Sequence, residues 1–455
     1  MVRVAQEKRT DLSVRSERAV LVGVLLPDTV RDLRDPLAEL RSLARTAGAV
    51  VVDQIVQRRD RIDPAFYVGR GKVEEIRLRA EACDADVIIF DNDLSPAQIR
   101  ELEEAIDRKV IDRSELILDI FATRAQTHEA RLQVELAQLE YTSPRLRGMW
   151  THLERIAGAA GGTGAGVVGG IGTRGPGESQ IEIDRRLVSQ RVTLLRRKLE
   201  QIDRRKVREI RARRDCFTVS LVGYTNAGKS TLMNALTGAE VLVEDRLFAT
   251  LDTKTRRWNL GDGQTALLSD TVGFVRDLPH HLVASFRATL EEAIHADLLL
   301  HVIDAASPEA EQQVQAVMAV LSDLGCAGHR VLPLLNKIDV AEDLAAVQLL
   351  ERQLPGAIRI SARTGRGLDV LVQRVGEIMR GEIRHARVRL PVHDGRAIAF
   401  LERKAEILDR RYEDHGVEFE VRLGARDLIC FEEKHPAARV ELVGAHPSRP
   451  AGSSG

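Results

Sequence analysis

The stretch Gly223-Tyr224-Thr225-Asn226-Ala227-Gly228-Lys229-Ser230 follows an apolar run at 217–222 and opens a predicted helix. It has the spacing G-x-x-x-x-G-K-S in the strand–loop–helix context that a phosphate-binding loop (P-loop) requires. Glycines allow backbone N–H groups to wrap around phosphates, and the N-terminus of the following helix favours negative charge. The stretch therefore predicts an α/β domain that binds a nucleotide.

Individual residues of the P-loop and of a second motif have predicted tasks. Lys229 would neutralise the β- and γ-phosphates, and Ser230 would offer its hydroxyl to Mg²⁺. Asp270-Thr271-Val272-Gly273 ends the next long strand-like run. At this distance after a P-loop, such a D-x-x-G motif predicts that Asp270 holds Mg²⁺ through water and that Gly273 presents its N–H to the γ-phosphate.

A third motif predicts the base. Asn336-Lys337-Ile338-Asp339 ends another apolar run, and Ser361-Ala362 follows it. The Asp339 carboxylate can accept two hydrogen bonds from the guanine Watson–Crick edge. Adenine lacks that pair of donors, and an unpaired buried carboxylate costs affinity by orders of magnitude. The three motifs in this order predict GTP, not ATP, as the ligand.

The group that activates hydrolysis is less evident. Thr250 is our candidate for a switch threonine that reaches Mg²⁺ only when the γ-phosphate is present. The alternative is an ordinary β-hairpin threonine. Phe274 stands where many GTPases have a water-orienting Gln, so we expect slow intrinsic hydrolysis. Asn226 is a candidate for binding K⁺ beside the phosphates, which would supply positive charge.

These motifs define three sets of candidate residues. The catalytic candidates are Lys229, Thr250, Gly273 and Asn226. The candidate Mg²⁺ ligands are Ser230, Thr250 and, through water, Asp270. The predicted GTP-binding residues are Gly223, Tyr224, Thr225, Asn226, Ala227, Gly228, Lys229, Ser230, Thr231, Phe248, Ala249, Thr250, Asp270, Thr271, Val272, Gly273, Asn336, Lys337, Asp339, Ser361, Ala362 and Arg363.

The chain before the P-loop has two patterns. Residues 1–111 alternate strand-like and helix-like runs, which predicts a small parallel α/β unit. Residues 112–214 lack strand signals. Leu132, Leu136 and Leu139 share one helical face, and five apolar residues between 188 and 202 form a heptad seam. We expect a long helical hairpin whose Gly-rich loop, 158–177, cannot pack a core.

The α/β alternation resumes at 215 and continues to 382, and we assign residues 215–382 to the nucleotide-binding domain. Residues 383–446 predict a small α+β domain, with a strand at 388–392, a helix at 395–411, and strands at 417–423 and 428–432. The stretch 436–455 is rich in Pro, Ser and Gly and predicts a disordered tail; we draw the end of the domain at 446, leaving 447–455 outside it.

Composition limits the class of protein. The 455 residues suggest about three domains. The four cysteines form no C-x-x-C motif, there is no signal peptide, and no apolar run reaches ~18 residues, so we expect a cytoplasmic protein without a membrane span. The net charge of −1 argues against a nucleic-acid binder, yet residues 185–214 hold thirteen Lys/Arg and three Asp/Glu. That segregation favours an RNA-facing helix.

Several longer stretches resemble the HflX family of ribosome-associated GTPases, and the resemblance covers nearly everything except the tail. They are Ile111-Asp-Arg-Ser-Glu-Leu-Ile-Leu-Asp-Ile-Phe121, Leu132-Gln-Val-Glu-Leu-Ala-Gln-Leu139, Pro144-Arg-Leu146, Gly169-Gly-Ile-Gly-Thr-Arg-Gly-Pro-Gly-Glu178 and Phe248-Ala-Thr-Leu-Asp252. The resemblance implies a monomeric GTPase that binds the 50S subunit and, in the GTP state, splits stalled or idle 70S ribosomes under heat or antibiotic stress. Hydrolysis then releases the factor.

The resemblance also implies that the helical segment enters the peptidyl-transferase region, with association to ribosomes or peripherally to the membrane. The rRNA-binding candidates are Arg174, Arg185, Arg186, Arg196, Arg197, Lys198, Arg204, Arg205 and Lys206. Some family members hydrolyse ATP through the N-terminal domain, but this chain has no second Walker motif, and the glycine turn at 69–72 has no assigned role. Two features depart from the family: Asp252-Thr253-Lys254 replaces Asp-Pro-Thr, and 157–168 is an apparent insertion that either reaches further into the ribosome or is inert.

Two other functions stay open on the sequence. One is a GTP-dependent assembly factor that docks on immature subunits without splitting ribosomes. The other is a metabolic kinase or ATPase, against which the guanine motif at 336–339 and the lack of a substrate-site motif both count.

Overall fold

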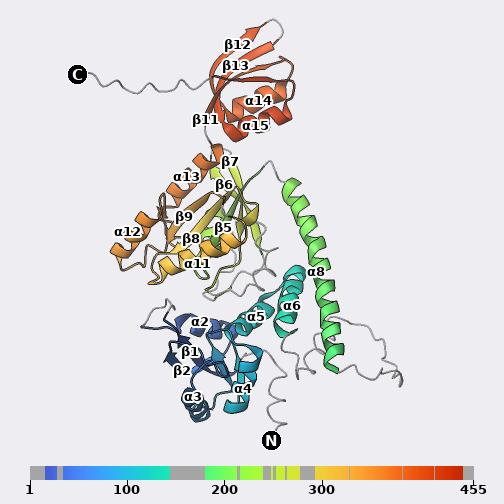
Figure 1. Cartoon of the computed structure of the whole chain (residues 1–455). Helices are drawn as coiled ribbons and strands as arrows, with labels where there is room; N and C mark the ends of the chain where they lie inside the picture. The colour runs from blue at the N-terminus through green and yellow to red at the C-terminus, as the bar shows by residue number, and fades with distance from the viewer. Residues whose placement is uncertain are drawn as a thin grey trace, which may run out of the picture. The chain divides into compact units, whose positions relative to one another are not determined.

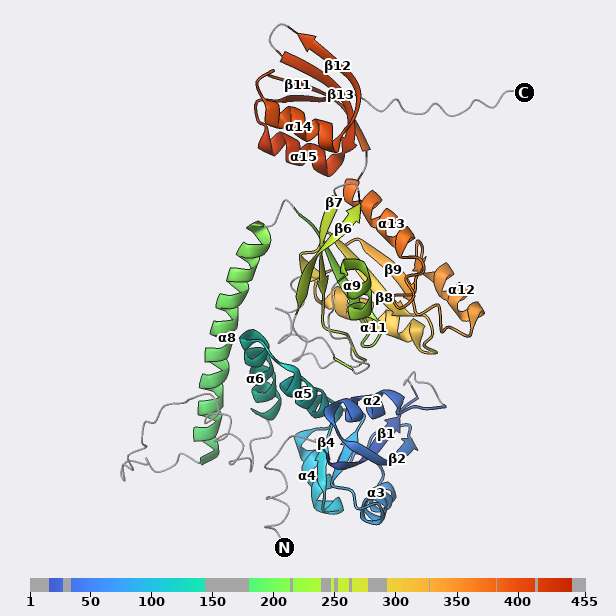
Figure 2. The ribbon, with the colours of Figure 1, turned by 180° about the vertical axis from the view of Figure 1, so that it is seen from behind.

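The computed structural model describes residues 16–27, 34–143, 180–212, 216–238, 247–248, 253–261, 264–276, 293–326, 328–381, 383–413 and 416–443. Figures 1 and 2 show its helices and strands from opposite sides. The chain forms two compact units, which we describe separately. The first comprises residues 1–212, 218–257 and 267–366, and the second comprises residues 213–217, 258–266 and 367–455.

The first unit begins with a parallel sheet in the order β2-β1-β3-β4. Its elements are β1 (Arg18–Leu25), α2 (Ala38–Ala47), β2 (Val50–Arg58), α3 (Arg70–Ala82), β3 (Val87–Phe90), α4 (Pro96–Ile106) and β4 (Lys109–Ile111). Alternate β1 residues face opposite sides: Leu21 packs in the core that includes α2, whereas Val22 packs in the core that includes α3 and α4. Both faces are covered, which is why the central strands β1 and β3 are almost continuously apolar, and the sheet confirms the predicted α/β unit.

Three helices follow: α5 (Arg113–Arg124), α6 (His128–Thr142) and α8 (Gln180–Ala212). Asp112 and Thr127 cap α5 and α6 by accepting backbone N–H bonds. The seam residues Leu132, Leu136 and Leu139 of α6 pack with the heptad residues of α8, and the two helices lie side by side in both views (Figures 1 and 2). The Gly-rich loop at 158–177 lies outside the described residues.

The P-loop sheet has the order β10-β9-β8-β5-β7-β6, with β5, β8, β9 and β10 parallel. Its elements are β5 (Phe217–Gly223), α9 (Lys229–Thr237), β6 (Lys254–Gly261), β7 (Gln264–Asp270), β8 (Leu298–Asp304), α11 (Ala310–Asp323), β9 (Val331–Asn336), α12 (Leu344–Gln353) and β10 (Ile358–Arg359). The carboxyl ends of β5, β8 and β9 therefore meet at one edge, the usual place for a ligand in an open parallel sheet.

The last elements are α13 (Leu368–Arg380), β11 (Ile383–Leu390), α14 (Gly395–Lys404), β12 (Glu406–Glu413), β13 (Gly416–Gly424), α15 (Ala425–Lys434) and β14 (Arg439–Leu442). The sheet order is β12-β13-β11-β14, and all three neighbouring strand pairs are antiparallel. The sequence β-α-β-β-α-β in this order is the ferredoxin-like arrangement. Alternate residues of β11 and β13, together with α14 and α15, form its core.

Three predictions for this small domain are wrong. Residues 406–411 belong to β12 rather than to a helix, because pairing with β13 outweighs their helical propensity. Residues 428–432 lie in α15: Leu428 and Phe431 are buried while Ile429 is 58% exposed, and a short apolar run does not reveal its period. Strand β14 lies inside the stretch expected to be a tail, where it pairs with β11.

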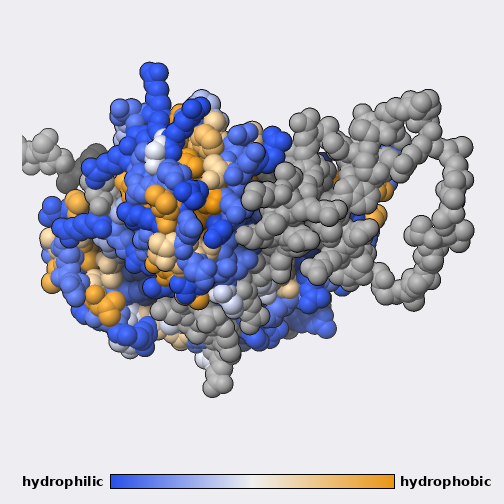
Figure 3. Space-filling model, turned by 90° about the horizontal axis from the view of Figure 1, so that it is seen from below, coloured by the Kyte–Doolittle hydropathy of each residue, from blue (hydrophilic) through white to orange (hydrophobic). Residues whose placement is uncertain are grey.

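Apolar side chains also reach the surface of the N-terminal sheet domain. Seen from below, a band of apolar side chains lies among hydrophilic ones on this face (Figure 3). The exposed large apolar residues of that domain include Val50, Ile62 and Leu78. No helix in the described ranges is long and apolar enough to cross a membrane.

Candidate active site

The P-loop lies between the end of β5 and the start of α9. Gly223 has φ +153° and a Cβ there would lie 2.2 Å from the Val302 carbonyl oxygen; Gly228 has φ +97° and a Cβ would lie 2.3 Å from Asn336 Nδ2. Only glycine fits both positions. Asn226 adopts φ 60°, a left-handed conformation that asparagine tolerates better than most residues, and its side chain is exposed.

The Lys229 amine is buried at the centre of this loop. Its Nζ donates hydrogen bonds to the carbonyl oxygens of Gly223 at 3.0 Å and Tyr224 at 2.9 Å. Burial lowers the pKa of Lys229 to about 8, although the nearby Asp270 carboxylate acts in the opposite direction. Phosphate oxygens would satisfy this desolvated cation better than carbonyl dipoles do, because charge-assisted hydrogen bonds are stronger.

A hydroxyl and a carboxylate meet beside Lys229. Ser230 Oγ, in the first turn of α9, donates to Asp270 Oδ2 at the end of β7 over 2.6 Å. Asp270 is fully buried. Hard oxygen ligands of this kind suit Mg²⁺, which binds through one or two protein groups plus phosphates and waters. The residues present therefore fit the predicted ion.

The residues that follow Asp270 lie directly on the P-loop; we call residues 270–276 the D-x-x-G segment. The Phe274 N–H donates to the Gly223 carbonyl at 3.1 Å, and the Thr225 N–H donates to the Phe274 carbonyl at 2.7 Å. A Cβ on Gly273 would lie 2.8 Å from Thr225 Cα and 2.9 Å from Lys229 Nζ. Glycine is required because the two backbones approach so closely.

The guanine motif is linked to the P-loop through one buried amide. Asn336 Nδ2 donates to the Ala227 carbonyl at 2.8 Å, and its Oδ1 accepts from the Ala362 N–H at 2.9 Å. Lys337, in a left-handed conformation at φ 63°, donates to Asp304 at 2.7 Å. The three loops at the carboxyl edge of the sheet are thus held in one arrangement.

Asp339 lies at the mouth of this arrangement, with a side chain 13% exposed. Hydrogen bonds from Ser361 and from Arg363, which lies 2.5 Å away, hold the pKa of this carboxyl below its usual range. The carboxylate is therefore ionised at neutral pH and able to accept two donors. Arg363 is 71% exposed, so a base can displace it at little cost.

Of the remaining predicted site residues, some lie near the P-loop, one packs elsewhere, and some lie outside the described residues. Thr231 and Thr271 lie close to the P-loop, with Thr271 donating to the Leu221 carbonyl at 2.7 Å. Phe248, expected at the nucleotide, instead packs edge-on against Phe121 of α5 with ring centroids 4.6 Å apart. Ala249, Thr250 and Arg174 lie outside the described residues.

The basic residues predicted to meet rRNA lie on α8. Arg186, Arg196, Arg197, Lys198, Arg204 and Arg205 are exposed, whereas the side chains of Arg185 and Lys206 lie outside the described part. Arg196 pairs with Glu140 of α6 at 2.7 Å, and Arg204 pairs with Glu200. Exposed ion pairs of this kind are weak and open to exchange with phosphate.

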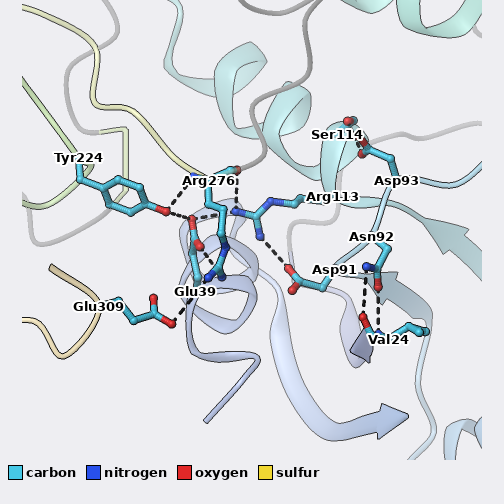
Figure 4. A network of polar contacts seen from close by, with 10 residues as sticks. All are labelled: Val24, Glu39, Asp91, Asn92, Asp93, Arg113, Ser114, Tyr224, Arg276 and Glu309. Carbon is cyan, nitrogen blue, oxygen red and sulfur yellow. Dashed lines mark hydrogen bonds and ion pairs between the residues drawn. The ribbon is translucent and has the colours of Figure 1, made fainter. Parts of the chain in front are cut away.

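Sequence reasoning missed a buried polar cluster next to the P-loop. Glu39, Arg113 and Arg276 surround the Tyr224 hydroxyl (Figure 4). It also missed His301, which is buried on β8; burial and the charge of Lys229 lower its pKa to about 4. No spacing signal connects Glu39 with Tyr224, which is 185 positions away, so only folding brings them together.

The sheet order, the P-loop at the end of β5 and the guanine motif at the end of β9 define a P-loop GTPase. Three family models match the chain: GTP-binding GTPase N-terminal at residues 34–122, GTP-binding GTPase Middle Region at residues 124–214, and 50S ribosome-binding GTPase at residues 218–337. Together they cover the N-terminal sheet except β1, the helical segment and most of the P-loop domain.

The chain is 44% identical to GTPase HflX of Lacrimispora saccharolytica over 409 residues, which is 90% of this chain and 93% of that protein. It is 43% identical to GTPase HflX of Escherichia coli strain K12 over 425 residues, 92% and 97% of the two chains. The chain belongs to the HflX family: it is a GTP hydrolase of a ribosome-binding GTPase family. A solved GTP-binding protein from Sulfolobus solfataricus in complex with GDP is 25% identical, with a TM-score of 0.40 over 79% of this chain and 97% of that one.

Proposed function

We propose that this GTPase binds the large ribosomal subunit and, in the GTP state, splits stalled or idle 70S ribosomes during heat or antibiotic stress. The observation that carries the proposal is α8, a 33-residue helix that precedes β5 in the chain and has exposed cations between Arg186 and Arg205. Cations in that number on one helix match the backbone of structured rRNA, here at the peptidyl-transferase region.

The GTPase cycle follows from linkage between the two ligands. GTP stabilises one arrangement of the D-x-x-G segment and of the stretch around Thr250, and that arrangement binds the ribosome better. The ribosome must then raise the affinity for GTP by the same factor. Hydrolysis to GDP removes the stabilising contacts, and the factor dissociates.

We assign the nucleotide chemistry to the predicted residues. Lys229 and the P-loop N–H groups bind the phosphates, Asp339 selects guanine, and Ser230, Thr250 and Asp270 hold Mg²⁺, which would neutralise charge developing on the phosphates. We assign K⁺ to the exposed Asn226; hydrolysis should then be faster in K⁺ than in Na⁺ at equal ionic strength, and equal rates would remove the assignment.

The decisive test is light scattering of 70S ribosomes mixed with the protein and GTP, GDP, ATP or a non-hydrolysable GTP analogue. Splitting lowers scattering with GTP and with the analogue but not with GDP or ATP. Unchanged scattering with retained binding to free 50S subunits would favour the assembly factor instead. Sucrose gradients run on the same mixtures identify the subunits released.

The contribution of α8 is measured by the salt dependence of 50S binding. If six of its cations meet phosphates, affinity falls about 1,000-fold between 50 and 200 mM salt. Arg197→Glu should reduce the slope of log K against log salt by about 1. Arg352→Glu, an equal charge change at an exposed position of α12, is the matched control and should leave the slope unchanged.

A further inference from the structure

A buried cluster of four polar side chains connects the D-x-x-G segment to helices α2 and α5 (Figure 4). Glu39 of α2 lies at its centre. One carboxylate oxygen, Oε1, accepts from Tyr224 Oη at 2.7 Å and from Arg113 Nη2 at 2.8 Å. The other, Oε2, pairs with Arg276 Nη2 at 2.9 Å. One carboxylate therefore contacts the P-loop, the D-x-x-G segment and α5.

The Tyr224 hydroxyl fixes the backbone as well as the side chains. While it donates to Glu39, it accepts the backbone N–H of Arg276 at 2.7 Å. The carbonyl of the same Tyr224 accepts the Lys229 amine at 2.9 Å. A single P-loop residue thus contacts the phosphate-binding lysine through its main chain and the D-x-x-G segment through its side chain.

Arg113 closes the cluster from the other side. Its Nη1 pairs with Asp91, at the end of β3, over 2.7 Å, and its Nη2 also donates to the Arg276 carbonyl at 3.2 Å. Arg113 is only 2% exposed. Burial by itself would raise the pKa of Glu39, but the charges of Arg113 and Arg276 and the Tyr224 hydrogen bond outweigh it, so this pKa lies below its ordinary value.

Apolar contacts reinforce the same junction. Val272 and Val275 of the D-x-x-G segment pack in one core with Leu37 and Leu40, which flank Glu39 in sequence. The second half of the segment is therefore held at two points: Phe274 by the P-loop backbone, and Arg276 by the buried cluster.

Gly273 lies so close to Lys229 that the position of the D-x-x-G segment affects binding of the γ-phosphate. A γ-phosphate must enter between the Lys229 amine and the Gly273 N–H. With a Cβ position on Gly273 only 2.9 Å from Nζ and 2.8 Å from Thr225 Cα, the segment must move outward to admit it. GDP lacks the γ-phosphate and needs no such movement. Contacts that hold residues 274–276 therefore oppose GTP more than GDP.

We propose that Tyr224 and Arg276, anchored by Glu39, are positioning residues that hold Gly273 against the P-loop and lower the affinity for GTP relative to GDP. The proposal rests on nucleotide binding at the P-loop. The buried cluster sets the preference between the two nucleotides. The binding-competent position of the segment is a minor one, and its population scales the apparent affinity for GTP.

The test compares Tyr224→Phe and Glu39→Gln with the wild type. Tyr224→Phe removes the hydroxyl and keeps the ring and the backbone. Isothermal titration gives Kd for GDP and for a non-hydrolysable GTP analogue, and the readout is the ratio of the two. We expect Kd for the analogue to fall about tenfold relative to Kd for GDP, the change that losing one or two buried hydrogen bonds produces. In Glu39→Gln, which lies outside the nucleotide-binding loops, Kd for GDP should stay within threefold.

The control is Glu135→Gln. Glu135 is a half-buried carboxylate on α6 that pairs with Arg191 at 2.6 Å, within the helical pair. Its ratio should equal that of the wild type. If Glu39→Gln fails to fold, Tyr224→Phe decides alone, because it leaves no buried charge unpaired.

Two results would overturn the proposal: a ratio unchanged within twofold in Tyr224→Phe, or both Kd values shifting in parallel, as a purely structural role predicts. The double variant adds a check, because residues of one cluster should give no larger ratio together than the stronger single change does. Absence of binding of either nucleotide to the wild type would instead refute the P-loop assignment.

Discussion

Asn336→Ala removes a side chain that joins the guanine motif, the P-loop and the loop after β10. The amide is 2% exposed and makes two buried hydrogen bonds, to the Ala227 carbonyl at 2.8 Å and from the Ala362 N–H at 2.9 Å. Truncation leaves one acceptor and one donor unpaired. At about 1–3 kcal/mol for each unsatisfied buried group, the cost is about 2–6 kcal/mol.

Part of this cost appears in nucleotide binding. In the free variant the two loops can relax towards water, and the ligand must restore their positions. The free energy of nucleotide binding then includes the cost of ordering these loops, which Asn336 orders before binding in the wild type. Even the lower value of about 2 kcal/mol corresponds to a Kd for GDP about 30-fold higher. Fluorescence titration with a labelled GDP measures this Kd, and thermal unfolding reports the accompanying loss of stability.

The control is Asn259→Ala, since Asn259 is exposed near the end of β6, in the second unit, and accepts the Gly261 N–H. It should bind GDP like the wild type. A Kd within threefold of wild type for Asn336→Ala would refute the reasoning. If melting temperature falls but Kd is unchanged, Asn336 stabilises the fold and does not organise the site.

Three further predictions follow from single residues. Asp339→Asn should lose guanosine nucleotides and bind xanthosine nucleotides, because the amide donates where the carboxylate accepts; calorimetry showing unchanged GDP affinity would contradict the base assignment. Lys229 has a pKa of about 8 in the protein, and phosphates favour its charged form, so nucleotide binding should take up protons above pH 8 and weaken with rising pH. Titrations in buffers of different ionisation enthalpy detect that uptake, and identical heats at pH 8.5 would exclude it. Leu195→Ala, at a fully buried seam position of α8, should cost about 2–5 kcal/mol in chemical denaturation, whereas Leu194→Ala, 44% exposed, should cost less than about 0.5 kcal/mol; equal losses would contradict the packing of α6 on α8.

The sequence determined the P-loop domain because its motifs carry their own geometry. Gly223 and Gly228 are the residues that a tight phosphate-wrapping loop demands, and each motif follows an apolar strand whose carboxyl end lies at the ligand edge. The seam between α6 and α8 could be predicted from the sequence for a similar reason, since a heptad repeat indicates which face of a helix is buried. Family, fold class and nucleotide type all followed from such local patterns.

The small C-terminal sheet and the buried cluster are different cases. Strand β12 and helix α15 were misassigned because their identity depends on partners distant in sequence, and short apolar or charged runs have no unique period. Arg113, Tyr224 and Arg276 are ordinary residues in ordinary contexts until folding places each of them within 3 Å of Glu39. A sequence determines those features whose physics is local, such as periodicity, turn geometry and capping. Which charges share a buried site is decided by tertiary structure, because burial strengthens their attraction and makes it costly to lose one partner.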